Sequence, residues 1–130
     1  MTPTEERTKA IKAAQLAHAL RHFTGSEHWY RHQLFRAFCY TDGVKYLATE
    51  AGAYWLLDRL FACQHEFPAL RQEEFQTWTL TVNADESAEL VCTDGNCRIL
   101  HRETIGYTDF PLESITLYLT NDVLLLPSEN

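Results

Sequence analysis

The hydrophobic pattern of the chain changes at Phe75, and this change limits the possible folds more than any other feature. Before that residue, apolar side chains recur at intervals of three and four, which is typical of one face of a helix. After it they alternate with polar ones: Trp78, Leu80 and Val82 are separated by threonines, as in a strand with one buried face. The chain has 130 residues, the length of one domain. We therefore expect a single α+β domain over residues 1–130.

Two main helices are predicted in the first part of the chain. The first covers about Pro3–Phe23, because Thr2 followed by a proline is a typical helix start and Gly25 supplies a stop. The second covers about Glu50–Cys63, with Thr49 as its expected N-cap. Each has an apolar stripe along one side, so we expect both to pack on one face of a sheet.

Five to six strands are expected, four of them consecutive. Asp94-Gly95 lies between two alternating segments and is a strong hairpin signal. Strands joined by such short turns favour an antiparallel β-meander, with the two helices packed on one face. The expected strands are Leu34–Tyr40, Phe75–Val82, Ala88–Thr93, Asn96–Ile105, Ile115–Leu119 and Val123–Leu126.

A two-residue turn at Asp94-Gly95 would place Cys92 opposite Cys97. Residues paired in this way have Cα atoms about 4.5–5.5 Å apart, a separation that a disulfide tolerates. The four cysteines of the chain are scattered, however, and do not form a disulfide framework. A reducing compartment would keep both as thiols, so we favour the interpretation that they are small apolar residues filling the hairpin.

The N-terminal residues 1–12 are polar and charged and lack the apolar segment of a secretory signal. No stretch approaches the ~20 apolar residues that cross a bilayer. These features predict a cytoplasmic protein without a membrane partner.

Four histidines form two pairs with a spacing of four residues, His18 with His22 and His28 with His32. On a helix this spacing places both imidazoles on one face, the geometry that two metal ligands need. Glu27 lies between the pairs and could add an oxygen ligand. One hypothesis is therefore a divalent-metal site, in a metal-binding protein or a small metal-dependent hydrolase. The alternative is that the histidines are solvated or pair with acidic residues further along the chain.

Asp42 is a second candidate acid/base partner for such a site. It ends the sequence Tyr-Thr-Asp, which recurs with Asp109 at its end. Both carboxylates could belong to one acidic site if the fold brings them together. Independent turns are the simpler interpretation, because Asp side chains bond nearby backbone N–H groups.

Aromatic and basic residues are interleaved at Trp29, Tyr30, Arg31 and Arg36, a pattern that suits stacking on exposed nucleic-acid bases. The charge balance opposes this interpretation: residues 1–40 have six Lys and Arg against three Glu, but the rest have five against fifteen acids, and the net charge is −7. Two alternatives follow. The two aromatic residues could anchor the first helix on the sheet, or the acidic part could mimic DNA for a partner of a mobile element.

Several segments together resemble a family of small uncharacterised proteins of bacteria, plasmids and phages, catalogued as a domain of unknown function. The resemblance implies a self-contained domain with an accessory or host-interaction role, and it transfers no catalytic residue. The segments that carry it are Phe23–Glu27, Tyr40–Leu47, Ala51–Asp58, Phe75–Trp78, Asp94–Asn96, Tyr107–Pro111 and Leu124–Glu129.

The sequence contains neither a nucleophile motif nor a phosphate-binding loop, and only five glycines. We therefore favour a non-catalytic accessory protein that acts through protein–protein contacts, with another protein or with a second copy of itself in a homodimer. The Leu-rich final hairpin is expected to leave an exposed sheet edge for such contacts.

Overall fold

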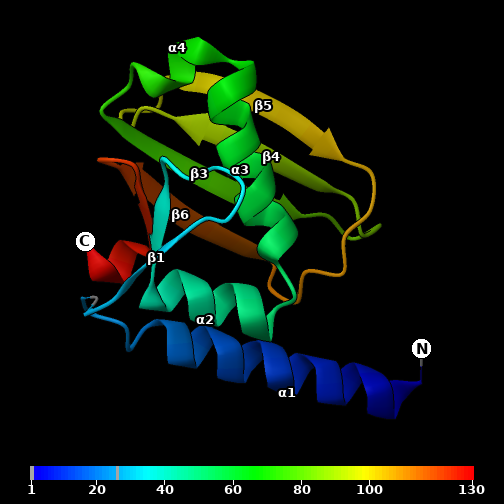
Figure 1. Cartoon of the computed structure of the whole chain (residues 1–130). Coiled ribbons are helices and arrows are strands. Elements are labelled where there is room, and N and C mark those ends of the chain that lie inside the picture. The colour runs from blue at the N-terminus through cyan, green and yellow to red at the C-terminus, as the bar shows by residue number, and fades with distance from the viewer. Residues whose placement is uncertain (1, 26) are drawn as a thin grey trace.

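The computed structural model describes residues 2–25 and 27–130, which form one seven-stranded sheet with helices on one face. Figure 1 shows α3 crossing in front of the sheet, while α1 and α2 lie side by side below it. The helices are α1 (Pro3–Leu20), α2 (Asp42–Glu50), α3 (Tyr54–Glu66), α4 (Pro68–Arg71) and the 3-10 turn η1 (Pro127–Glu129). The strands are β1 (Trp29–Arg31), β2 (Cys39–Thr41), β3 (Phe75–Val82), β4 (Ala88–Thr93), β5 (Ile99–Ile105), β6 (Ser114–Thr120) and β7 (Val123–Leu125).

The α+β class is confirmed, but the sheet is not a simple meander of five to six strands. Its order is β1-β2-β7-β6-β3-β4-β5, and β2 runs parallel to β7. The turn at Asn121 and Asp122, with φ angles of 52° and 62°, folds β7 back onto β6 with the twist that hairpins favour. The free side of β7 then pairs with β2, where the Cys39 N–H donates to the Asp122 carbonyl over 2.9 Å.

The Leu-rich end of the chain is therefore inside the sheet, and the expectation that it leaves an exposed edge is wrong. Leu124 and Leu126 belong to the buried core. The strands at the two edges of the sheet are β1 and β5. Pairing on both sides of β7 satisfies its backbone groups, so this hairpin offers no free edge to a partner.

The predicted second helix, Glu50–Cys63, corresponds to α3, which begins later, at Tyr54. Glu50 is instead the last residue of a separate helix, α2, and Gly52, with a φ of 61°, lies between the two. The start of α2 was expected to be a turn. Thr41 caps it by accepting a hydrogen bond from the Val44 N–H over 3.3 Å. Because Thr, Asp and Gly are common both in turns and at helix starts, the sequence does not distinguish the two. Thr49 lies in the last turn of α2 and bonds the Tyr54 hydroxyl, so it is not a cap.

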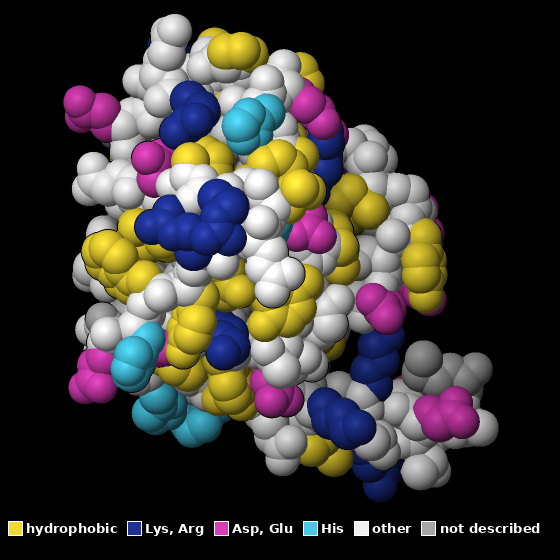
Figure 2. Space-filling model, in the orientation of Figure 1, with side chains coloured by type: hydrophobic (Ala, Val, Ile, Leu, Met, Phe, Trp, Pro, Cys, Tyr) yellow, Lys and Arg dark blue, Asp and Glu magenta, His cyan; other side chains and the backbone are white. Residues whose placement is uncertain are grey.

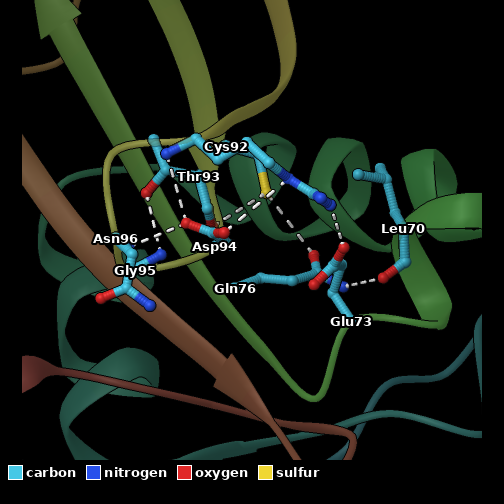
Figure 3. A network of polar contacts seen from close by, with 9 residues as sticks. Leu70, Glu73, Gln76, Cys92, Thr93, Asp94, Gly95 and Asn96 are labelled. Carbon is cyan, nitrogen blue, oxygen red and sulfur yellow. Dashed lines mark hydrogen bonds and ion pairs between the residues drawn. The ribbon is translucent and has the colours of Figure 1, made fainter.

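The β4–β5 hairpin has a longer turn than expected, which separates the two cysteines. Asp94 accepts hydrogen bonds from the N–H groups of Asn96 (2.8 Å) and Arg98 (3.3 Å), and its own N–H donates to the Arg98 carbonyl. Figure 3 shows the Asp94 carboxylate turned into this loop. Cys92 consequently pairs with His101. Cys92 is buried while Cys97 is exposed, so the expected facing pair does not form.

This arrangement gives the thiols different reactivities. Burial raises the pKa of Cys92 to about 12, and the thiolate is the reactive form. We expect Cys97 to react rapidly with an aromatic disulfide reagent at pH 8, and Cys92 to react only after unfolding. Mass spectrometry of labelled peptides measures both. Equal labelling of the two cysteines in the folded protein would contradict the hairpin described here.

A polar network is buried between α3, α4 and β3. Gln64 and Gln76 exchange two amide hydrogen bonds of 2.9 Å, and the indole N–H of Trp78 donates to the Gln76 Oε1 atom over 2.9 Å. Figure 3 shows Gln76 reaching the Leu70 carbonyl on one side, at 2.7 Å, and the Cys92 sulfur on the other. Among the described residues, no buried side-chain nitrogen or oxygen lacks a partner. The network therefore fixes how α3 lies on the sheet.

The chain end closes the N-terminus of α2. The Glu129 carboxylate accepts hydrogen bonds from the Thr41 hydroxyl (2.6 Å), the Leu126 N–H (2.9 Å) and the Gly43 N–H (3.2 Å). A Cβ atom at Gly43 would lie 2.6 Å from both Glu129 and Leu126, so the close approach requires glycine. A carboxylate at a helix N-terminus is also favoured by the helix dipole.

Candidate functional site

An edge hairpin, residues 29–41, combines exposed apolar and basic side chains on a fixed backbone. It consists of β1, β2 and the connecting residues 32–38. Trp29 and Leu34 are 64% and 75% exposed, and Arg31 and Arg36 are also exposed. Figure 2 shows Lys and Arg side chains in the middle of this face of the molecule, with hydrophobic side chains around them.

His32 holds the connecting residues of the edge hairpin in place. Its Nδ1 atom accepts hydrogen bonds from the N–H groups of Leu34 (3.2 Å) and Phe35 (3.0 Å). The proton is therefore on Nε2, which donates to Asp58 on α3 over 2.6 Å. The ring is buried beside Phe61. Both nitrogens are engaged by the protein itself, so His32 is a structural residue rather than the predicted metal ligand.

The expected strand Leu34–Tyr40 is reduced to its end, because β2 begins at Cys39. Residues 32–38 instead form a tight loop in which the Phe38 N–H donates to the Phe35 carbonyl over 3.0 Å. Arg31 also donates to the Arg36 carbonyl. Bonds that the loop makes with itself replace pairing with a strand, which leaves Leu34 outside the core.

Tyr30 and Asp42 join the edge hairpin to the first turn of α2. The Tyr30 hydroxyl donates to Asp42 over 2.9 Å, and this hydrogen bond raises the pKa of Tyr30. The Lys45 ammonium lies 4.1 Å from the centre of the Tyr30 ring, and Tyr40 stacks against the ring at 5.8 Å. The Tyr30 ring is thus held by contacts with Asp42, Lys45 and Tyr40. Trp29, by contrast, does not anchor the first helix, because it points into solvent.

The other predicted ligands do not gather into one site. His22 donates from Nδ1 to the His18 carbonyl over 2.9 Å, and their rings are 4.6 Å apart. His28 lies 3.6 Å from the Asp42 carboxylate, and Glu27 is exposed. Among the described residues, the one group of three or more ligand side chains at metal-binding separation contains none of these residues.

Asp42 is the first residue of α2, whereas Asp109 lies between β5 and β6. Asp109 lines a groove of about 800 Å³ between α1 and α2, beside Glu50 and Ala51. Asp42 and Glu50, the first and last of the nine residues of α2, are about 12 Å apart along the helix axis. Asp42 does not line this groove, and its carboxylate accepts the hydrogen bond from Tyr30, so the groove is not the shared acidic site that the repeated Tyr-Thr-Asp sequence suggested.

A second group of functional side chains, which the sequence interpretation missed, lies between α3 and β5. It consists of Cys63, His101 and Glu103, whose ligand atoms all lie within 4.8 Å of one another. Arg59 binds Glu103 through two hydrogen bonds of 2.6 Å and holds the pKa of that carboxyl below its usual value. His101 donates to Glu103 from Nε2 over 3.1 Å. The alternation of His101 and Glu103 on one strand indicated a shared face, but nothing local linked them to Cys63.

The fold and these sites define a small α+β domain with one helix-covered sheet face. Residues 14–130 match the model of a family of unknown function, DUF6876, and the chain belongs to this family. The resemblance to a domain of unknown function is thereby confirmed. No curated protein and no solved structure matches the chain. In the described part of the chain, no helix has the length and apolarity needed to cross a bilayer.

Proposed function

We propose that this protein is a non-catalytic accessory protein that binds another protein through the edge hairpin. The observation that carries the proposal is that Trp29 and Leu34 are exposed on the same short hairpin as the exposed Arg31 and Arg36, on a backbone fixed by His32. Trp and Arg are the residues most often found at the energetic centre of protein interfaces. A backbone that is already ordered loses little conformational entropy on binding.

The charge of the edge hairpin indicates the chemistry of the partner. Residues 29–41 contain two arginines and no acidic residue, although the whole chain carries a net charge of −7. A complementary surface would have an apolar pocket for Trp29 and acidic groups around it. The strongly acidic residues 41–130 of a second copy could also supply such groups, so a homodimer is one outcome of the test.

Nucleic acid is less well supported as the partner. Of the two aromatic residues expected to stack on bases, Tyr30 is covered by Lys45 and Tyr40 and bound to Asp42. Trp29 alone of this pair remains exposed. Two arginines also provide few phosphate contacts.

The test compares the proteins captured from cells by three immobilised forms: the wild type, Trp29→Ala and Tyr107→Ala. Tyr107 is a matched control because it is similarly exposed but follows β5, at the other edge of the sheet. We expect Trp29→Ala to retain at least tenfold less of the partner, and Tyr107→Ala to retain as much as the wild type. Sedimentation of the same three forms detects a homodimer, and added single-stranded DNA detects the nucleic-acid alternative. Equal capture by Trp29→Ala and the wild type would contradict the proposal.

A further inference from the structure

Cys63, His101 and Glu103 bring a sulfur, a nitrogen and an oxygen ligand together from two elements that are far apart in sequence. Cys63 lies on α3, and His101 and Glu103 lie two residues apart on β5, on the sheet face that α3 covers. Their ligand atoms are within 4.8 Å of one another. Glu side chains are almost never fully buried unless they are paired, and here a Glu and a His, each less than a fifth exposed, converge on a buried thiol.

The surroundings of this group fix its geometry. Cys63 is fully buried, and the side chains of His101 and Glu103 are 14% and 19% exposed. The Phe67 ring covers His101, with 4.6 Å between the ring centres. The backbone of β5 pairs with β4, with His101 opposite Cys92, so the strand cannot slide. Ligands on paired strands and helices are held more firmly than ligands on loops.

We propose that Cys63, His101 and Glu103 form a binding site for a zinc-like divalent metal ion. Thiolate, imidazole and carboxylate are the three ligand types that Zn²⁺ prefers, whereas Mg²⁺ and Ca²⁺ select oxygen ligands alone. Three protein ligands leave the fourth tetrahedral position for water or another ligand. Ligand atoms around a tetrahedral zinc are about 3.3–3.8 Å apart. Because all pairs in this group lie within 4.8 Å, no pair has to approach by more than about 1.5 Å.

Metal binding requires that Arg59 release the Glu103 carboxylate. Its guanidinium group holds both oxygens of Glu103 at 2.6 Å, and it also donates to Glu66 over 2.9 Å. The metal must take Glu103 from Arg59, which keeps its ion pair with Glu66. The hydrogen bond that His101 donates to Glu103 is also broken, and a neutral His101 then binds through its unprotonated ring nitrogen. The Cys63 thiol gives its proton to solvent as the sulfur–metal bond forms. The site is independent of the edge hairpin, because it lies next to β5, at the opposite edge of the sheet from β1.

Cobalt chloride is the probe, because Co²⁺ occupies zinc sites and absorbs light. The full chain, purified without an affinity tag, is titrated and its absorption is recorded. We expect one ion per chain, with a thiolate-to-cobalt charge-transfer band and the visible bands of a tetrahedral ion. Zinc is expected to displace the cobalt and to raise the melting temperature. Absence of the thiolate band at saturating cobalt would overturn the proposal.

Substitutions of single residues test which side chains bind the metal. Cys63→Ser is expected to remove the charge-transfer band, and His101→Gln to weaken zinc binding at least tenfold. Cys97→Ser is the matched control and should bind as the wild type does. If Cys63→Ser does not fold, the partly exposed His101 still provides the test.

Arg59→Gln is expected to bind zinc more tightly than the wild type, because the substitution frees the Glu103 carboxylate. A group with a purely structural role would not give this result. Loss of binding in His18→Gln, with His101→Gln unaffected, would overturn the assignment.

Discussion

Replacing Gln76 with leucine is expected to lower the free energy of unfolding by about 3–5 kcal/mol, although the new side chain is apolar and similar in size. The change leaves the Trp78 N–H and the Gln64 Oε1 atom without their partner in the core. The Gln64 Nε2 atom keeps its bond to the Leu60 carbonyl, and the Leu70 carbonyl keeps the bond from the Glu73 N–H. Each buried group that loses its hydrogen bond costs about 1–3 kcal/mol. Urea denaturation followed by circular dichroism measures the loss.

The double variant Gln64→Leu/Gln76→Leu separates hydrogen bonding from packing. It also removes the Gln64 amide, which is one of the buried groups that Gln76→Leu alone leaves unpaired. We expect it to be more stable than Gln76→Leu alone, because two partners removed together cost less than one. A loss below about 1 kcal/mol in the single variant would show that the network does not hold α3 on the sheet.

Replacing His32 with alanine is expected to release residues 32–38 and to cost about 2–3 kcal/mol of stability. The ring accepts two backbone N–H bonds and donates one bond to Asp58, and each net contribution is about 1 kcal/mol. Hydrogen exchange should increase most at the amides of Leu34 and Phe35, which lose their acceptor.

Asp58→Asn is the matched control for His32→Ala. Its amide oxygen can still accept the bond from His32 Nε2, so we expect less than half of the stability loss and little change in exchange at Leu34. We also expect His32→Ala to weaken partner binding. The edge hairpin of this variant would become ordered only when the partner binds, and this ordering costs free energy. Unchanged exchange in His32→Ala would show that the loop does not depend on this ring.

The elements that were predicted correctly are those whose sequence signals lie within a few neighbouring residues. The capping box of Thr2 and Glu5 begins α1 as expected, and the alternation after Phe75 forms β3. The hairpin turn at Asn121 and Asp122 also forms. The seven-strand order could not be predicted, because the parallel pairing of β2 with β7 joins segments more than 80 residues apart.

The errors have specific physical causes. The Asp94 carboxylate bonds two backbone N–H groups and so extends the turn that was expected to contain two residues. His32 has the spacing of a metal ligand, but Asp58 and the loop amides occupy its nitrogens. Trp29 was considered as an anchor of the first helix on the sheet, but it is exposed. Local sequence gives no information on which distant residue a side chain will meet.

Direct contact between the edge hairpin and a partner is tested by placing a photoreactive amino acid at position 34 or, as a control, at position 107. Both positions are exposed, and irradiation of living cells links each to whatever protein lies against it. The expected result is a cross-linked product of defined mass from position 34, none from position 107, and loss of the product when Trp29→Ala is added. A product from position 107 with none from position 34 would contradict a binding role for the edge hairpin.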